Sequence, residues 1–227
     1  MVRRTKAEAE ETRHRLLDAA EIVFQAKGVS RTTLQDIAQA AGTSRGAIYW
    51  HFKDKAALFN AMMDRAILPL ECGFPSADTR VSDLPQPLEA IRSGMQHVFD
   101  LLARDERLRR ALEVATHQVE YNAEMTAARD RHLRVRGHYL ALTTDLLELA
   151  AQRLGRPLPV SAQHAAMGLH ALVDGLLHNW LLQTQAFDLP TVGRNVVDTY
   201  LQGLGFTAGP PPARAPHRRA RAPSTEA

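Results

Sequence analysis

The chain has 227 residues, and its 28 Lys and Arg against 25 Asp and Glu give a net charge of +3. Apolar residues make up 45% of it, enough to bury cores, but no run of about 20 apolar residues occurs, which argues against a membrane span. The N-terminal stretch MVRRTKAEAEETR is charged where a signal peptide would be apolar, so we expect a cytoplasmic protein. The single cysteine, Cys72, can form no internal disulfide and no thiolate zinc site, which agrees with a reducing compartment.

Basic residues gather at the two ends of the chain. They are Arg3, Arg4, Lys6, Arg13 and Arg15 at the start and Arg214, Arg218, Arg219 and Arg221 near the end. Basic arms beside a folded unit favour contact with a phosphate backbone. The Pro- and Ala-rich tail, residues 207–227, cannot bury an apolar face, so we expect it to be disordered, and solubility is the alternative role for its charges.

Apolar residues recur at spacings of three and four, and strand-forming runs are sparse, so the sequence predicts an all-α fold. The first helix should end at Lys27 before Gly28, and the second should begin at Thr32 or Thr33 and stop at Gly42. A short helix from Ser44 follows at once. Two short helices joined by a tight, Gly-containing turn make a helix-turn-helix.

The start of the third helix has the composition of a recognition surface. In a helix-turn-helix this end enters the major groove, where side chains must be small enough to admit base edges. Thr43, Ser44, Gly46 and Ala47 meet that condition. Arg45 can bond bidentately to guanine or reach a phosphate. We therefore expect the segment to read DNA.

Residues just beyond this start should anchor the helix and contact the DNA backbone. Ile48 and Phe52, four residues apart, should pack on the core, while the polar-tipped rings of residues 49–51 can donate to phosphates. The alternative for these rings is a packed aromatic cluster. Asp54 is the expected N-cap of a fourth helix, and Lys55 in its first turn is the expected phosphate clamp.

The segment TTLQDIAQAAGTSRGAIYWHFKDKAALF closely resembles the DNA-binding domain of the tetracycline-repressor (TetR) family. The start of the chain looks like the branch that represses multidrug efflux pumps. The resemblance implies an all-helical homodimer, with a DNA-binding domain over residues 1–58 and a ligand-binding and dimerisation domain over residues 59–206. By position it also implies phosphate contacts from Tyr49, His51 and Lys55 and operator contacts from Thr33, Ser44, Arg45 and Gly46, with Trp50 either packing or contacting the DNA backbone. Thr43 and Ala47, from the groove argument above, complete the candidate DNA-binding residues.

Past Met63 the sequence predicts long amphipathic helices near residues 54–71, 87–103, 106–125, 128–154, 161–184 and 190–204. Several of them carry a mostly apolar face with one or two polar groups. Such faces could be ordinary core, or they could converge on a cavity for a hydrophobic or aromatic effector. The candidate ligand-binding residues are Ile91, Met95, Val98, Leu112, Thr116, Tyr139, Thr143, His170, Val173 and Asn179.

No motif for catalysis, a cofactor or a metal is evident. The rows Glu113, His117, Glu120 and His170, Asp174, His178 have helical spacing but drift around the helix, so we expect no metal site. An enzyme would need a nucleophile with a base, or a metal, and the sequence offers neither.

The last two helices are rich in Leu, Val and Ala, and by the family resemblance they should pack against their copies in a four-helix interface. A dimer presents two recognition helices to a palindromic DNA operator. The predicted function is a repressor that hydrophobic small molecules release from DNA, controlling an efflux-pump operon. The alternative is a helix-turn-helix activator or a general DNA-binding protein without an effector.

Overall fold

The computed structural model describes residues 6–76 and 78–206, and all the regular secondary structure in these residues is helical, α-helices with short 3-10 and π segments, as predicted. The predicted tail and the first basic residues lie outside the described part of the chain. The α-helices are α1 (Lys6–Lys27), α2 (Leu34–Ala40), α3 (Arg45–His51), α4 (Lys55–Glu71), α5 (Pro87–Arg104), α6 (Glu106–Glu113), α7 (Thr126–Leu154), α8 (Ala162–Leu182) and α9 (Leu189–Gly203).

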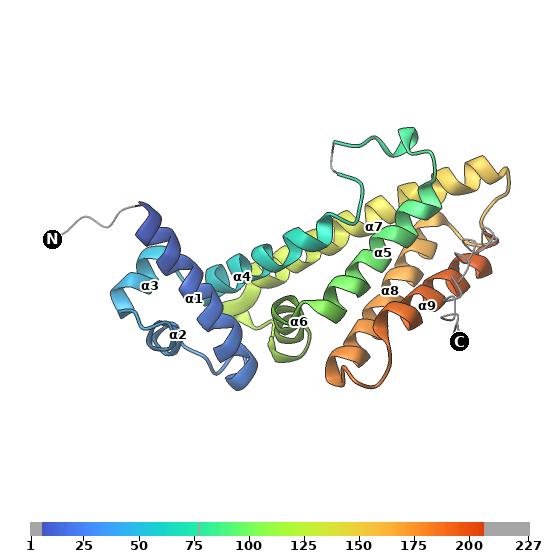
Figure 1. The fold of residues 1–227 in the computed structure, drawn as a ribbon. Coiled ribbons are helices and arrows are strands. Elements are labelled where there is room, and N and C mark those ends of the chain that lie inside the picture. The colour runs from blue at the N-terminus through green and yellow to red at the C-terminus, as the bar shows by residue number, and fades with distance from the viewer. Residues whose placement is uncertain (1–5, 77, 207–227) are drawn as a thin grey trace, which may run out of the picture.

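Helices α1 to α3 form a small unit at one end of the molecule, and α8 and α9 lie towards the other end (Figure 1). Helices α4 and α7 run side by side between them (Figure 1). Within residues 6–76 and 78–206, no helix combines the length and the apolar character needed to cross a bilayer.

Two separate apolar cores hold the chain together. The smaller core packs Leu16 and Phe24 of α1 against Ile37, Ile48 and Phe59 of the next three helices, and all five side chains are buried. This core extends along α4 to Met63 and takes in Val114, Met125 and Ala128 from later in the chain. The predicted boundary between residues 58 and 59 therefore stays a prediction, since α4 belongs to both units.

The larger core lies among α5, α7, α8 and α9. Phe99 of α5 is fully buried at its centre, and Gly193 of α9 lets the two helices approach there, since a Cβ at Gly193 would lie 2.5 Å from the Phe99 ring. Tyr200 of α9 donates its hydroxyl to the carbonyl of Ala165 in α8, 2.9 Å away. The larger domain is thus held together by contacts between residues that lie far apart in the sequence.

The expected helix over residues 106–125 is wrong in its second half. Helix α6 ends at Glu113, a π-helical segment (η2, Val114–Gln118) follows, and a 3-10 turn (η3, Ala123–Met125) leads into α7. The carbonyl of Gln118 accepts the backbone N–H of Val29, 2.9 Å away. The side chain of Asn122 caps the following turn at the N–H of Met125. Contacts from outside the helix thus override the apolar periodicity, and π-helical turns frequently mark functional sites.

A buried carboxylate joins the small unit to the larger one. Glu21 of α1 is only 3% exposed and bonds to Arg65 of α4 and to Arg107 of α6, the latter at 3.3 Å. Asp18, one turn earlier and largely exposed, contacts the same two arginines at 2.9 and 2.5 Å. Removing a buried ion costs most when its partners are left without compensation.

We predict that Glu21→Ala lowers the free energy of unfolding by about 2–3 kcal/mol, because it leaves Arg65 and Arg107 with the exposed Asp18 alone. Asp18→Ala is the matched control and should cost less than about 1 kcal/mol, as exposed ion pairs do. Urea unfolding followed by circular dichroism measures both. Equal losses in the two variants would contradict a special role for the buried carboxylate.

Candidate DNA-binding surface and effector domain

Local capping fixes the two helices of the helix-turn-helix. Thr33 caps α2, accepting from the N–H of Asp36 at 3.2 Å while its own N–H donates to the Asp36 carboxylate at 2.9 Å. The N–H of Thr33 first, and then its hydroxyl, which also donates to the Asp36 carboxylate at 2.9 Å, lower the pKa of Asp36. Thr33 was predicted as an operator contact, and its side chain is already engaged in this capping box.

The turn between α2 and α3 is as tight as predicted. Gly42 has a φ of +63°, a left-handed conformation that favours glycine, and the N–H of Thr43 donates back to Ala38 at 2.9 Å. Ser44 caps α3 by accepting the N–H of Ala47 at 3.2 Å. The start of α3 is thereby held in one orientation.

The exposed face of α3 carries most of the predicted DNA contacts. Ser44, Arg45 and Gly46 are exposed, and a Cβ at Gly46 would meet nothing closer than Ser44 Oγ at 3.9 Å. Open space at the front of a helix permits close approach to a groove. Thr43 and Ala47 are half-buried beside it. The same helix buries Ile48 completely in the small core.

The aromatic residues of α3 point to solvent. Tyr49 is 49% and Trp50 is 73% exposed, which excludes the packed cluster considered from the sequence. The guanidinium of Arg45 lies 5.7 Å from the centre of the Tyr49 ring, and the rings of Trp50 and His51 meet edge to face. A large exposed tryptophan beside an arginine is typical of a binding surface.

Lys55 differs from its prediction as a phosphate clamp. It is only 6% exposed, and its ammonium donates to the carbonyls of Ser30 and Thr32 at 3.1 and 3.0 Å. It also pairs with Glu124 of η3 at 3.1 Å. A buried ammonium with three partners has a structural role, because leaving them would expose unpaired carbonyls. The sequence could not reveal this, since the partners lie far along the chain.

Lys53 is the basic residue that the sequence analysis missed at this surface. Its side chain is 81% exposed just after α3, and its ammonium lies 3.7 Å from the carboxylate of Asp54. An exposed lysine between α3 and α4 can reach a phosphate without breaking the fold. The alternation of Lys53 and Lys55 in the sequence gives no sign of which one is buried.

Two further contacts tie the small unit to the segment after α6. Ser30 donates its hydroxyl to Glu120 at 3.2 Å, and Gln25 of α1 donates to Glu113 at 2.8 Å. Together with the bond between Val29 and Gln118, they attach the loop that precedes α2 to the π-helical segment. The position of the helix-turn-helix therefore depends on residues 113–124.

Most of the predicted ligand-binding residues lie in or against the larger core. Ile91, Val173 and Thr143 are buried, and Met95, Val98, Leu112, Tyr139 and His170 are half-buried. Burial, with a smaller effect of Glu71, raises the pKa of Tyr139 to about 12, so its phenol is a neutral hydrogen-bond donor at pH 7. Burial lowers the pKa of His170, and Asp174 opposes that shift.

Thr116 and Asn179 do not join this group. Both are exposed, and Asn179 donates to Gly175 of its own helix at 2.7 Å. The prediction for Thr116 assumed a regular helix, and the π-helical segment changes the direction in which each side chain points. His117 takes the inward position instead: its ring lies 4.5 Å from that of His178, and its buried Nε2 has no hydrogen-bond partner.

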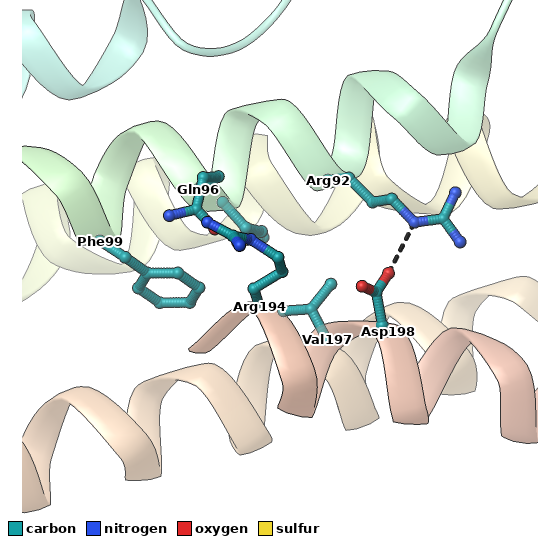
Figure 2. A pocket seen from close by; sticks show the side chains of 7 residues that line it. Arg92, Gln96, Phe99, Arg194, Val197 and Asp198 are labelled. Carbon is teal, nitrogen blue, oxygen red and sulfur yellow. Dashed lines mark hydrogen bonds and ion pairs between the residues drawn. The ribbon is translucent and has the colours of Figure 1, made fainter. Parts of the chain in front are cut away.

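Figure 2 shows the side chains that line a crevice between α5 and α9. Its cavity volume is about 10 Å³, room for about one water molecule and far below the size of a drug-binding pocket. Arg92 and Asp198, 2.7 Å apart, bridge it, and Arg194 contacts Gln96 at 3.1 Å (Figure 2). Of the predicted ligand residues, Met95 alone lines it. Among the described residues no group of three or more His, Cys, Asp or Glu could hold a metal ion.

Comparison with known proteins fits this arrangement. Residues 16–62 match the model of the bacterial regulatory proteins of the tetR family, and residues 86–206 match the C-terminal region of MAATS-type transcriptional repressors. The chain belongs to the TetR family. It is 40% identical over 210 residues to the transcriptional repressor BepR of Brucella suis, covering 92% of this chain and 100% of BepR.

Solved TetR-family structures have the same fold over nearly their whole length. NalD, the secondary repressor of the MexAB-OprM multidrug efflux pump in Pseudomonas aeruginosa, superposes with a TM-score of 0.77 at 32% identity, covering 88% of this chain and 98% of NalD. The complex of SmeT with triclosan gives a TM-score of 0.72 at 32% identity, covering 91% and 99%. SmeT is the repressor of the Stenotrophomonas maltophilia efflux pump SmeDEF.

As a member of the TetR family, this chain is a DNA-binding transcriptional regulator and not an enzyme. The all-α fold with an N-terminal helix-turn-helix and a C-terminal helical domain, which the resemblance implied, is confirmed.

The two lysines make a matched pair for mutation. Lys53→Ala should weaken binding to operator DNA about threefold to tenfold and lower the slope of log K against log salt by about one, with stability unchanged. Lys55→Ala should instead lower the free energy of unfolding by about 2–3 kcal/mol, because two buried carbonyls lose their donor. Salt titrations by fluorescence anisotropy and urea unfolding separate the two effects. If Lys55→Ala instead lowered the salt slope of operator binding and left the free energy of unfolding unchanged, Lys55 would contact a phosphate, as first predicted.

Proposed function

We propose that this chain is a dimeric, cytoplasmic repressor that binds a palindromic operator and leaves it when a hydrophobic aromatic compound binds the larger domain. The regulated gene would be an efflux-pump operon, by analogy with NalD and SmeT, which repress multidrug efflux pumps. The observation that carries the proposal is the exposed front of α3, where Ser44, Arg45 and Gly46 stand clear of the fold beside Tyr49 and Trp50.

Each exposed group on α3 has a definite use against DNA. The fork of Arg45 can bond to a guanine edge, while Ser44 and the half-buried Ala47 can contact bases or a thymine methyl. Tyr49, Trp50 and Lys53 lie where they can reach the phosphates that flank the groove. Phosphate contacts supply most of the affinity, and the base contacts then choose the sequence.

A dimer is the natural state of such a protein. One copy of α3 reads only one half-site, and a two-fold axis places two of them one helical turn apart, about 34 Å. Helix α8 leaves Met167 and Leu182 47% and 65% exposed, and a second copy could cover these side chains. We assign the faces of α8 and α9 that the monomer leaves open to the contact with a second copy.

Release by a ligand would work through the junction between the two units. A compound that spreads the larger core moves α6 and the π-helical segment, which contact α8 on one side and α1 on the other. The loop of residues 28–32 is bonded to residues 118–124, so the helix-turn-helix follows. Two recognition helices that change their separation lose register with the major groove, and ligand and DNA then oppose each other reciprocally.

Fluorescence anisotropy on the duplex just upstream of the protein's own gene, at fixed salt, tests the whole proposal. Tight binding to this duplex, lost on addition of triclosan or another aromatic drug, is the expected result. Binding no tighter than to random duplex would contradict it and favour a general DNA-binding protein. Tight binding that no aromatic drug relieves would contradict the effector part alone.

Arg45 provides the test of groove reading. Arg45→Ala should cost about 1–3 kcal/mol of operator binding and relax the preference at one base position, because the bidentate fork is lost. Arg45→Lys is the matched control: it keeps the charge and the phosphate attraction but cannot make two parallel bonds. If both variants keep the same base preference as the unchanged protein in a competition assay with single-base operator variants, α3 does not read that position through Arg45.

A further inference from the structure

An aromatic side chain of the protein occupies a slot between α5 and α7. Phe74 follows the end of α4, and its ring lies over Gly94 of α5, where a Cβ would be 2.5 Å from Cε1 and 2.6 Å from Cδ1 of the ring. The ring centre of Tyr139 in α7 is 5.3 Å away on another side, at an interplanar angle of 56°. The slot is bounded by the backbone of α5 at Gly94 on one side and by the ring of Tyr139 on another.

The slot exists because residue 94 is a glycine. A glycine inside a helix costs stability relative to alanine, so a buried one needs a reason in its packing. At Gly94 that reason is the space for a flat ring against the helix backbone, since any side chain there would meet Phe74. Aromatic rings prefer such tilted contacts with other rings, at centroid separations of about 4.5–7 Å.

The slot is surrounded by residues of the effector domain. Tyr139 is a predicted ligand-binding residue, and Ile91 and Met95 flank Gly94 in α5. Ile91 is 1% exposed and belongs to the larger core, and Met95 packs against it. The neutral phenol of Tyr139 can donate a hydrogen bond to a polar group on an incoming ring. The slot thus has the chemistry of a site for a phenol-like aromatic compound.

The ring that fills the slot is held less firmly than the slot itself. Phe74 is half-buried and sits in a turn, with its N–H donating to Glu71 at 3.0 Å, whereas Gly94 and Tyr139 lie within long helices. Moving Phe74 therefore disturbs one turn, and moving the other two disturbs a helix. The occupant can leave while the slot keeps its shape.

We infer that Phe74 is a built-in competitor of the effector, so that an aromatic ring of the ligand binds between Gly94 and Tyr139 by displacing the Phe74 ring. The inference rests on the proposed function for the link to DNA and adds to it the position and the class of the ligand. It also gives a physical route to α4. The turn that carries Phe74 is the end of α4, and His97 of α5 holds that end by donating to the carbonyl of Pro69 at 2.9 Å.

The displacement sets how tightly the effector binds. Each molecule of effector must first meet a protein whose slot is empty, and its apparent affinity falls by the fraction of molecules in that state. Phe74→Ala removes the competitor. It should tighten binding about tenfold if the open slot makes up about a tenth of the ligand-free population. A second substitution, Gly94→Val, then fills the emptied slot with a side chain that no ligand can displace.

The test uses the full chain and two probes, triclosan and the single-ring 4-chlorophenol, in isothermal titration calorimetry. Phe74→Ala should bind both probes about tenfold more tightly than the unchanged protein, and Phe74→Ala/Gly94→Val should lose that gain. Operator binding without ligand, measured by anisotropy, checks that each variant is folded. The double variant avoids the clash that Gly94→Val alone would make with the Phe74 ring.

The outcomes separate the inference from the function. Unchanged or weaker affinity for both probes in a folded Phe74→Ala protein overturns the competitor role, even if triclosan still releases DNA. If Phe74→Ala binds the probes more tightly and the added Gly94→Val does not remove that gain, the ligand binds elsewhere. That result also overturns the competitor role of Phe74. Tighter binding that Gly94→Val abolishes, without any release of operator DNA, upholds the aromatic slot and refutes the proposed ligand-controlled repression.

Discussion

The ammonium of Lys55 lies beside the smaller apolar core, bonded to the carbonyls of Ser30 and Thr32 and to the carboxylate of Glu124. A buried cation is tolerated only when its partners are in place, because each missing partner leaves a charge or a carbonyl without compensation. The three partners come from the loop before α2 and from the turn before α7. Their simultaneous engagement fixes where the helix-turn-helix sits on the larger domain.

Glu21 completes this arrangement with the opposite charge. It binds Arg65 of α4 and Arg107 of α6, so α1 is held against both helices at once. The junction therefore uses polar contacts with definite geometry, alongside the shared apolar side chains of Val114 and Met125. Polar contacts of this kind break at a small displacement, whereas apolar contacts can slide. A junction built on them suits a protein whose DNA-binding unit must respond to a rearrangement of the other unit.

Sequence reasoning succeeded where the signal is local. The caps at Thr33, Ser44 and Asp54 each involve a residue three positions away, and the turn at Gly42 needs only one backbone conformation. The burial of Ile48 and the exposure of Arg45 follow from the period of one helix. For the same reason the exposed front of α3 was predictable, while the roles of its residues at the DNA stay predictions.

It failed where the partner lies far along the chain. Lys55 looked like a surface lysine because Glu124 is 69 positions away and the carbonyls it binds leave no mark in the sequence. The predicted helix over residues 106–125 was too long, because no neighbouring residue in the sequence indicates that the N–H of Val29 donates to the carbonyl of Gln118. Thr116, which that helix would have turned inwards, is exposed, and so is Asn179 of α8. The space at Gly94 is a further case, because a glycine in a helix does not indicate that the ring of Phe74 packs on it.

The packing of the larger domain limits how a ligand can enter it. Phe99 and Ile91 are at most 1% exposed, and the crevice that Phe99 lines has a cavity volume of about 10 Å³, far less than a drug-sized molecule needs. An effector that enters among these side chains must displace some of them, and close-packed interiors yield first where the fewest contacts are lost. The larger core fixes α5 along its length and α7 from Leu140 onwards. The turn after α4 is held by two backbone bonds, by the bond from His97 to Pro69 and by one half-buried ring, so moving it loses few contacts, in line with the inferred displacement of Phe74.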